Sequence, residues 1–66
     1  MKNSIKVERA VKGLTQEELA QAIAVSRQTI NAIESGKYVP STVLALKIAR
    51  VFEKPVEEIF SLEAGD

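Results

Sequence analysis

The 66-residue sequence contains no cysteine and no histidine. Without cysteine, neither disulfide bonds nor thiolate metal sites can hold the fold together. The absence of both residues also removes the usual general base, the most reactive nucleophile and the soft metal ligands of enzymes. The carboxylate pairs Glu17/Glu18 and Glu57/Glu58 stand at expected helix starts, where the helix dipole already accounts for them. We therefore expect a protein that is not an enzyme and that needs no metal and no cofactor.

Long hydrophobic runs are also missing. The N-terminal stretch "MKNSIKVERAVKG" has no unbroken apolar segment of the signal-peptide kind, and no run approaches the ~20 residues of a membrane span. We expect a cytoplasmic protein without membrane contact. A chain this short forms a single domain, residues 1–66, and buries only about 60% of its unfolded surface, so that a second subunit would help to stabilise it.

An excess of one charge is absent as well, because nine basic residues balance nine acidic ones. Zero net charge by itself argues against a simple polyanion binder. The distribution is uneven, however: residues 1–40 carry six basic and four acidic side chains, a net +2, whereas residues 41–66 carry three and five, a net −2. The mild basic excess lies in the first part of the chain.

The apolar residues that are present follow helical spacing. Val7, Ala10, Val11 and Leu14 stand at i, i+3, i+4 and i+7, which predicts a first helix that buries this stripe and ends near Gly13. "TVLALKIARVF", after a loop with Pro40, is apolar on more than one face. This segment therefore predicts a helix that is central or partly covered by a second subunit.

Capping signals mark the remaining helices. Thr15 and Glu18 form a T-x-x-E capping box before a second helix, and Ser26 caps a third that Gly36 ends. Ser41 caps the apolar fourth helix, and Pro55 suits the first position of a short fifth one. The residues expected to face inwards from the second and third helices are Leu19, Ala20, Ile23, Ile30 and Ile33.

The break between the second and third helices is only "AVS", residues 24–26. A turn this short sets two helices at a steep angle, which predicts a helix-turn-helix over about residues 16–35. Small Ala20 suits the point where the helices touch. The first turn of the third helix then exposes Arg27, Gln28 and Thr29 at the end that enters the DNA major groove in such motifs. The same residues would also suit an ordinary solvated face, and it is the adjoining turn that favours DNA contact.

The stretches "LTQEELAQAIAVSRQTINAIESGKYVPS" and "LALKIARVFEKPVEEIF" resemble the lambda-repressor-like, Cro/repressor-type helix-turn-helix family, also called the XRE family. The resemblance extends from about Ile5 to Phe60. It implies an all-α, compact five-helix bundle that acts as a homodimeric transcriptional regulator on palindromic operators. In similar short repressors the two termini form a strand pair, which "MKNS" and "SLEAGD" would supply here.

The resemblance also implies roles for individual residues. Gln16 matches a position that contacts a phosphate and can brace a side chain of the recognition helix. Arg27 and Gln28 match base-contacting positions, and Thr29 and Asn31 match positions that touch the backbone or a further base. All five are therefore expected to bind DNA.

A second group of implied roles lies after the third helix. Lys37 and Tyr38 match phosphate contacts, although Tyr38 could equally cover the end of the core. Val39, Val56 and Phe60 match a region near the two-fold axis of the dimer, although they could also be ordinary core residues. We expect the first pair to bind DNA and the other three to form the dimer interface.

Among the positions that depart from the family pattern, two concern the fold. Ala24 stands where glycine is common, and a left-handed conformation there costs about 1 kcal/mol. Glu8 stands where many members have leucine, and we expect it to pair with a nearby Arg or Lys.

Together these observations predict a sequence-specific regulator of double-stranded DNA, most simply a repressor, without a small-molecule ligand. The alternative is a protein-interaction module, such as an antitoxin whose DNA binding is autoregulatory or lost. Zero net charge keeps this alternative open.

Overall fold

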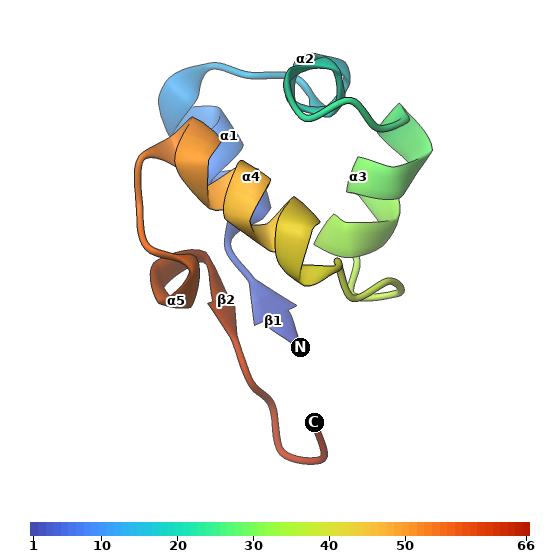
Figure 1. The fold of residues 1–66 in the computed structure, drawn as a ribbon, viewed down its shortest axis with the longest axis vertical. Coiled ribbons are helices and arrows are strands. Elements are labelled where there is room, and N and C mark those ends of the chain that lie inside the picture. Colours follow the sequence, from blue (N-terminus) through green and yellow to red (C-terminus); the bar gives the residue numbers. More distant parts are fainter.

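The computed structural model describes all 66 residues and contains five helices and one two-stranded sheet. In Figure 1, α4 crosses the middle of the molecule, α2 and α3 lie on one side of it, and α5 with the two strands lies on the other. None of the helices is long and apolar enough to cross a membrane. The elements are β1 (Lys2–Asn3), α1 (Ile5–Lys12), α2 (Gln16–Ala22), α3 (Arg27–Glu34), α4 (Thr42–Phe52), α5 (Val56–Ile59) and β2 (Phe60–Ser61).

The two termini meet in the sheet, as the resemblance implied. Strands β1 and β2 are antiparallel, with Lys2 opposite Ser61 and Asn3 opposite Phe60. The Asn3 side chain also donates a hydrogen bond of 2.9 Å to the carbonyl of Ile33, at the end of α3. The expected compact five-helix fold with a terminal strand pair is thus confirmed.

The capping residues begin their helices as expected. Thr15 accepts a hydrogen bond of 3.0 Å from the Glu18 amide, and the Glu18 carboxylate accepts one of 2.9 Å from the Thr15 amide, which completes the capping box. The hydroxyls of Ser26 and Ser41 each accept one amide hydrogen bond of 3.2 Å at the starts of α3 and α4. Pro55 differs by one position, because it is the cap of α5 and not its first helical residue.

The core lies where α2, α3 and α4 meet. Side chains with no exposed surface, or almost none, interlock there, which removes apolar area from water and supplies most of the folding free energy. The inward residues expected from the second and third helices are all buried: Leu19, Ala20, Ile23, Ile30 and Ile33. Helix α4 adds Ile48, Ala49 and Phe52, while its outer face, with Val43 and Leu46, stays exposed.

The prediction that α1 buries the side chains of Val7 and Val11 is wrong. Val7 and Val11 are 62% and 77% exposed, and the helix instead buries Ile5 and Glu8. A buried carboxylate needs a partner, and Lys54, in the turn after α4, donates a hydrogen bond of 2.8 Å to Glu8. The expected pairing of Glu8 with a basic residue is therefore confirmed, and it explains why an acidic side chain can face the core.

Candidate nucleic-acid interface

The turn between α2 and α3 brings the two helices into close contact. Ala20 is fully buried at the contact, and its carbonyl accepts a hydrogen bond of 3.0 Å from the Val25 amide. Ala24 adopts φ +59°, the left-handed conformation that was expected to be costly without glycine. Because this geometry sets the angle of α3, the turn determines how the first turn of α3 projects from the surface.

The first turn of α3 carries two unengaged polar side chains. Arg27 and Gln28 are exposed, and neither side chain forms a hydrogen bond or ion pair within the chain. Thr29 is partly buried, and its hydroxyl lies 3.0 Å from that of Ser26, so it takes part in the cap of the helix. Arg27 and Gln28 are thus free to contact another molecule.

Gln16 links the start of α2 to α3. Its amide nitrogen donates to the Asn31 side-chain oxygen at 3.4 Å and to the Glu34 carboxylate at 3.2 Å. The geometry fits the bracing role that the resemblance implied for Gln16. Both contacts use the side-chain nitrogen of Gln16, and together they hold the side chain against α3.

The carboxylate of Glu34 is the centre of this network. Arg9 of α1 donates to both of its oxygens, from Nε at 2.6 Å and from Nη2 at 3.1 Å, and a third nitrogen of Arg9 donates to the Leu14 carbonyl at 3.0 Å. Both side chains are largely buried, with 15% and 8% exposed. The hydrogen bond to Glu34 raises the pKa of Arg9 above its ordinary value. Such a paired, two-point contact fixes α1 against the end of α3.

Sequence reasoning missed Arg9 and Glu34 because the two residues are 25 positions apart and no local pattern joins them. The only available signal was two opposite charges on faces that also carry core residues. Arg9 lies beside the predicted Gln16 and Arg27, and the three residues line one open hollow of about 620 Å³. The hollow combines the unpaired guanidinium of Arg27, the amide of Gln16 and the paired guanidinium of Arg9. The acidic residue Glu17 lines it as well.

The remaining expected contacts lie at the other end of α3, about 12 Å along the helix axis. Lys37 and Tyr38 follow the helix, and both of their backbone amides donate to the Ala32 carbonyl, at 2.9 and 3.2 Å. Tyr38 is 46% exposed and is not among the side chains that pack against the core. The expected DNA-contacting residues thus form two groups, one at each end of α3.

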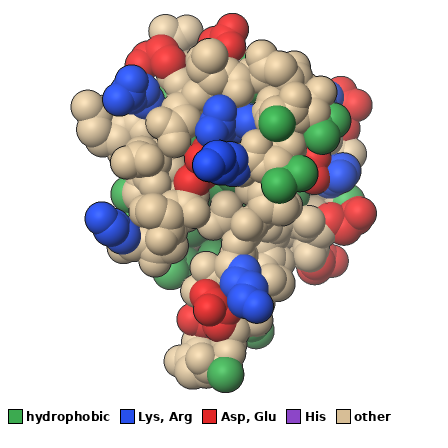
Figure 2. Space-filling view, turned by 180° about the vertical axis from the view of Figure 1, so that it is seen from behind, with side chains coloured by type: hydrophobic (Ala, Val, Ile, Leu, Met, Phe, Trp, Pro, Cys, Tyr) green, Lys and Arg blue, Asp and Glu red, His purple; other side chains and the backbone are tan.

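Positive charge is not continuous over the surface. On the face that Figure 2 shows, some Lys and Arg side chains adjoin near the middle, whereas the others lie apart toward the edges with acidic side chains near several of them. This agrees with the zero net charge. Attraction to polyanions in general is therefore weak, and tight binding to DNA would need contacts specific to its sequence.

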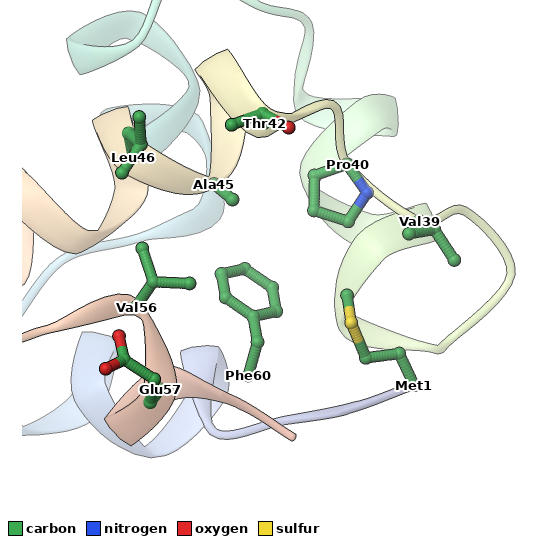
Figure 3. Close-up of a pocket in the computed structure, with 9 residues that line it drawn as sticks. All are labelled: Met1, Val39, Pro40, Thr42, Ala45, Leu46, Val56, Glu57 and Phe60. Carbon is green, nitrogen blue, oxygen red and sulfur yellow. The ribbon is translucent and has the colours of Figure 1, made fainter. Parts of the chain in front are cut away.

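The residues expected at a dimer interface come together on the side away from this turn. Val39 is 60% exposed, Val56 is partly buried and Phe60 is 7% exposed, and all three line an apolar groove of about 370 Å³. Figure 3 shows the Phe60 ring beside Val56, with Leu46 above them on α4. Phe60 is both a core residue and a wall of the groove.

The sequence and fold of this chain match a known family. The helix-turn-helix family profile matches residues 5–59, which is most of the chain. The chain therefore belongs to the helix-turn-helix family of the Cro and lambda-repressor type, whose members are DNA-binding transcriptional regulators and not enzymes.

Individual relatives agree with this assignment. A protein of Methanocaldococcus jannaschii named as an HTH-type transcriptional regulator is 57% identical over 63 residues, which cover 96% of each chain. The HTH-type transcriptional regulator YgzD of Bacillus subtilis is 51% identical over the same share of both chains. The restriction-modification controller protein C.AhdI of Aeromonas hydrophila has a similar solved structure, with a TM-score of 0.77, 32% identity and 85% of both chains covered.

Proposed function

We propose that this protein is a homodimeric repressor that binds a palindromic operator through α3. The observation that carries the proposal is the pair Arg27 and Gln28, exposed and unengaged on the first turn of α3. A recognition helix enters the major groove with this end foremost. Membership of a family of DNA-binding regulators supports the same role.

Base recognition is assigned to these two side chains. Arg27 can donate two hydrogen bonds to guanine O6 and N7, and Gln28 can pair in the same two-point manner with adenine N6 and N7. Each such contact contributes roughly 1–3 kcal/mol of discrimination against a wrong base. Thr29 and Asn31, which are held by Ser26 and Gln16, are proposed to touch the DNA backbone or one further base.

Phosphate contacts would position the protein on the duplex. Gln16 is proposed to contact one phosphate from the hollow that it lines with Arg9 and Glu17, by exchanging one of its amide hydrogen bonds to Asn31 or Glu34 for a bond to the phosphate. Lys37 and Tyr38 are proposed to bind a second phosphate at the far end of α3.

Dimerisation is assigned to the groove lined by Val39, Val56 and Phe60. A 66-residue chain has a small core, so burying this apolar surface against a second copy would add stability as well as symmetry. Two copies of α3 would then enter successive major grooves about 34 Å apart. A dimer bound in this way would exclude other proteins from a promoter, which is the proposed mode of repression.

The test is selection of bound sites from a random duplex library at near-physiological salt, followed by titration of the selected site against scrambled DNA. We expect a two-fold symmetric site that is bound roughly a thousandfold more tightly than scrambled DNA. Weak enrichment without symmetry would contradict the proposal and favour the protein-interaction alternative.

A double substitution tests the assignment of the residues. Arg27→Ala with Gln28→Ala should abolish the preference for the selected site and leave the helical circular dichroism unchanged, because both side chains are free of internal contacts. Lys6→Ala is the matched control, since it removes one positive charge from the exposed side of α1. Normal site preference in the double variant would show that other residues recognise the bases.

A further inference from the structure

The outer face of α4 carries two basic residues without partners. Val43, Leu46, Lys47 and Arg50 stand at i, i+3, i+4 and i+7, and together they line a shallow surface hollow of about 260 Å³. The ion pairs of the chain join other residues, so Lys47 and Arg50 have no carboxylate partner within it. We call these four residues the α4 strip.

Leu46 connects this strip to the apolar groove. It is 56% exposed and lines both the groove and the α4 strip, so the two surfaces are continuous. The opposite edge of the groove carries Glu57 of α5, which lies beside Val56 in Figure 3. Glu57 is exposed, and its carboxylate has no ion pair or hydrogen bond within the chain. An apolar groove is thus flanked by unpaired positive charge on α4 and unpaired negative charge on α5.

This arrangement is complementary to itself. In a two-fold symmetric interface, the contact from surface i to surface j is repeated from j to i. If the two-fold axis runs along the groove, between its two edges, the positive edge of each copy lies beside the negative edge of the other. Unpaired charges of opposite sign at the rim would then meet twice, while the apolar residues between them become buried.

We propose that the occupant of the groove is a second copy of this chain, and that Lys47 and Arg50 of each copy pair with Glu57 of the partner subunit. This proposal rests on the proposed dimer and assigns the residues that select its partner. Apolar contacts alone would accept many partners, whereas opposed charges at a rim favour one pairing and penalise like-charged ones. The three charges therefore act as specificity determinants that restrict pairing to chains with the same charge arrangement.

Charge reversal tests the proposal by sedimentation velocity of the full chain without DNA. Variant A carries Lys47→Glu and Arg50→Glu, and variant B carries Glu57→Lys. Each variant alone would place like charges together, so we expect the dimer dissociation constant to rise about tenfold or more. An equal mixture of A and B should form a heterodimer close to wild-type strength, because both contacts again join opposite charges. The triple variant should likewise recover its homodimer and pair poorly with wild type.

The control variant Lys6→Glu with Lys12→Glu makes the same charge change as A on α1, no residue of which lines the groove. It should dimerise as wild type does. Unchanged dimers of A and B, or a mixture that does not recover, would overturn the charge pairing while leaving the groove dimer in place. A wild-type chain that stays monomeric both in solution and on its selected DNA site would overturn the pairing and the proposed dimer together.

Discussion

The α2–α3 side of the molecule and its α4–α5 side differ in how completely their apolar side chains are buried. On the first side, Leu19, Ile30 and Ile33 have at most 1% of their surface exposed. On the second, Leu46 and Val39 remain 56% and 60% exposed around a groove. The helix-turn-helix is therefore complete in a single chain, whereas the other side still has area to bury. This teaches that the geometry of α3 does not depend on a partner, although the proposed spacing of two such helices does.

The largest loss of stability should come from removing a core side chain on the α2–α3 side. Ile30→Ala deletes fully buried atoms where α2 and α3 meet, and we expect a loss of roughly 2–5 kcal/mol in the free energy of unfolding. Urea denaturation followed by circular dichroism measures the effect. A loss below about 1 kcal/mol would mean that this side is packed less tightly than the burial indicates.

Glu34→Gln tests the polar network on the same side. It leaves the largely buried Arg9 without a carboxylate, and we expect roughly 3 kcal/mol of destabilisation, because a charge that loses its buried partner is costly. Gln16 keeps one acceptor, so DNA affinity should fall less than in the Arg27 and Gln28 double variant. Paired measurements of thermal unfolding and DNA titration separate the two effects, and unaltered stability would contradict the role of Glu34.

A substitution in the turn between α2 and α3 should raise the stability of the protein instead of lowering it. Ala24→Gly should stabilise the protein by up to about 1 kcal/mol, because glycine adopts φ +59° without the steric cost that alanine pays. The rise in the unfolding midpoint should appear in the same denaturation assay. Ala10→Gly, at an exposed position within α1, is the control and should destabilise instead. Equal effects of both glycines would remove the strain argument.

A pH titration examines the contact between α1 and the turn after α4. The hydrogen bond to Glu8 raises the pKa of Lys54 above its ordinary value of 10.5. A folded-state pKa above the unfolded one stabilises fully at lower pH, and this contribution is lost as the pH rises through the folded value. Lys54→Met should therefore melt below wild type at pH 7, and the two melting temperatures should converge above about pH 10.5. A constant difference across that range would exclude the ion pair as the cause.

The smallest effect on folding should come from the open side. Leu46→Ala alters a side chain that is 56% exposed, so we expect the free energy of unfolding of the monomer to change by no more than about 0.5 kcal/mol. The same variant should weaken the proposed dimer in sedimentation experiments. Val39→Asp is a second probe of the groove and is preferable to a change at Phe60, which is buried in the core. Dimers unaffected by either change would place the interface elsewhere.

The accuracy of the sequence predictions follows from how local each signal is. The capping box of Thr15 and Glu18 and the inward residues Ile30 and Ile33 depend on neighbours within a few positions, and the structure confirms them. The left-handed conformation at Ala24 is the one that the resemblance implied for a position where glycine is common. These short-range features establish the helix-turn-helix.

Long-range pairs were beyond such reasoning. Val7 and Val11 have the spacing of a buried stripe, yet α1 turns Glu8 inwards because Lys54, 46 residues away, neutralises it. The departure from the family pattern at Glu8 indicated a basic partner, but nothing local in the sequence identified that partner as Lys54. The same limitation concealed the contact between Arg9 and Glu34, and with it the network that holds Gln16.

The freedom of Arg27 and Gln28 has a consequence for how such a protein changes over generations. Neither side chain supports the fold, so substitutions at these two positions should carry almost no stability cost, and under the proposed base contacts they would be open to selection for other DNA sequences. The surrounding framework, with Gln16, Asn31 and Glu34 bound to one another, would stay unaltered while the preferred site changes. The residues proposed to read the bases are therefore separate from the residues that hold α3 in place.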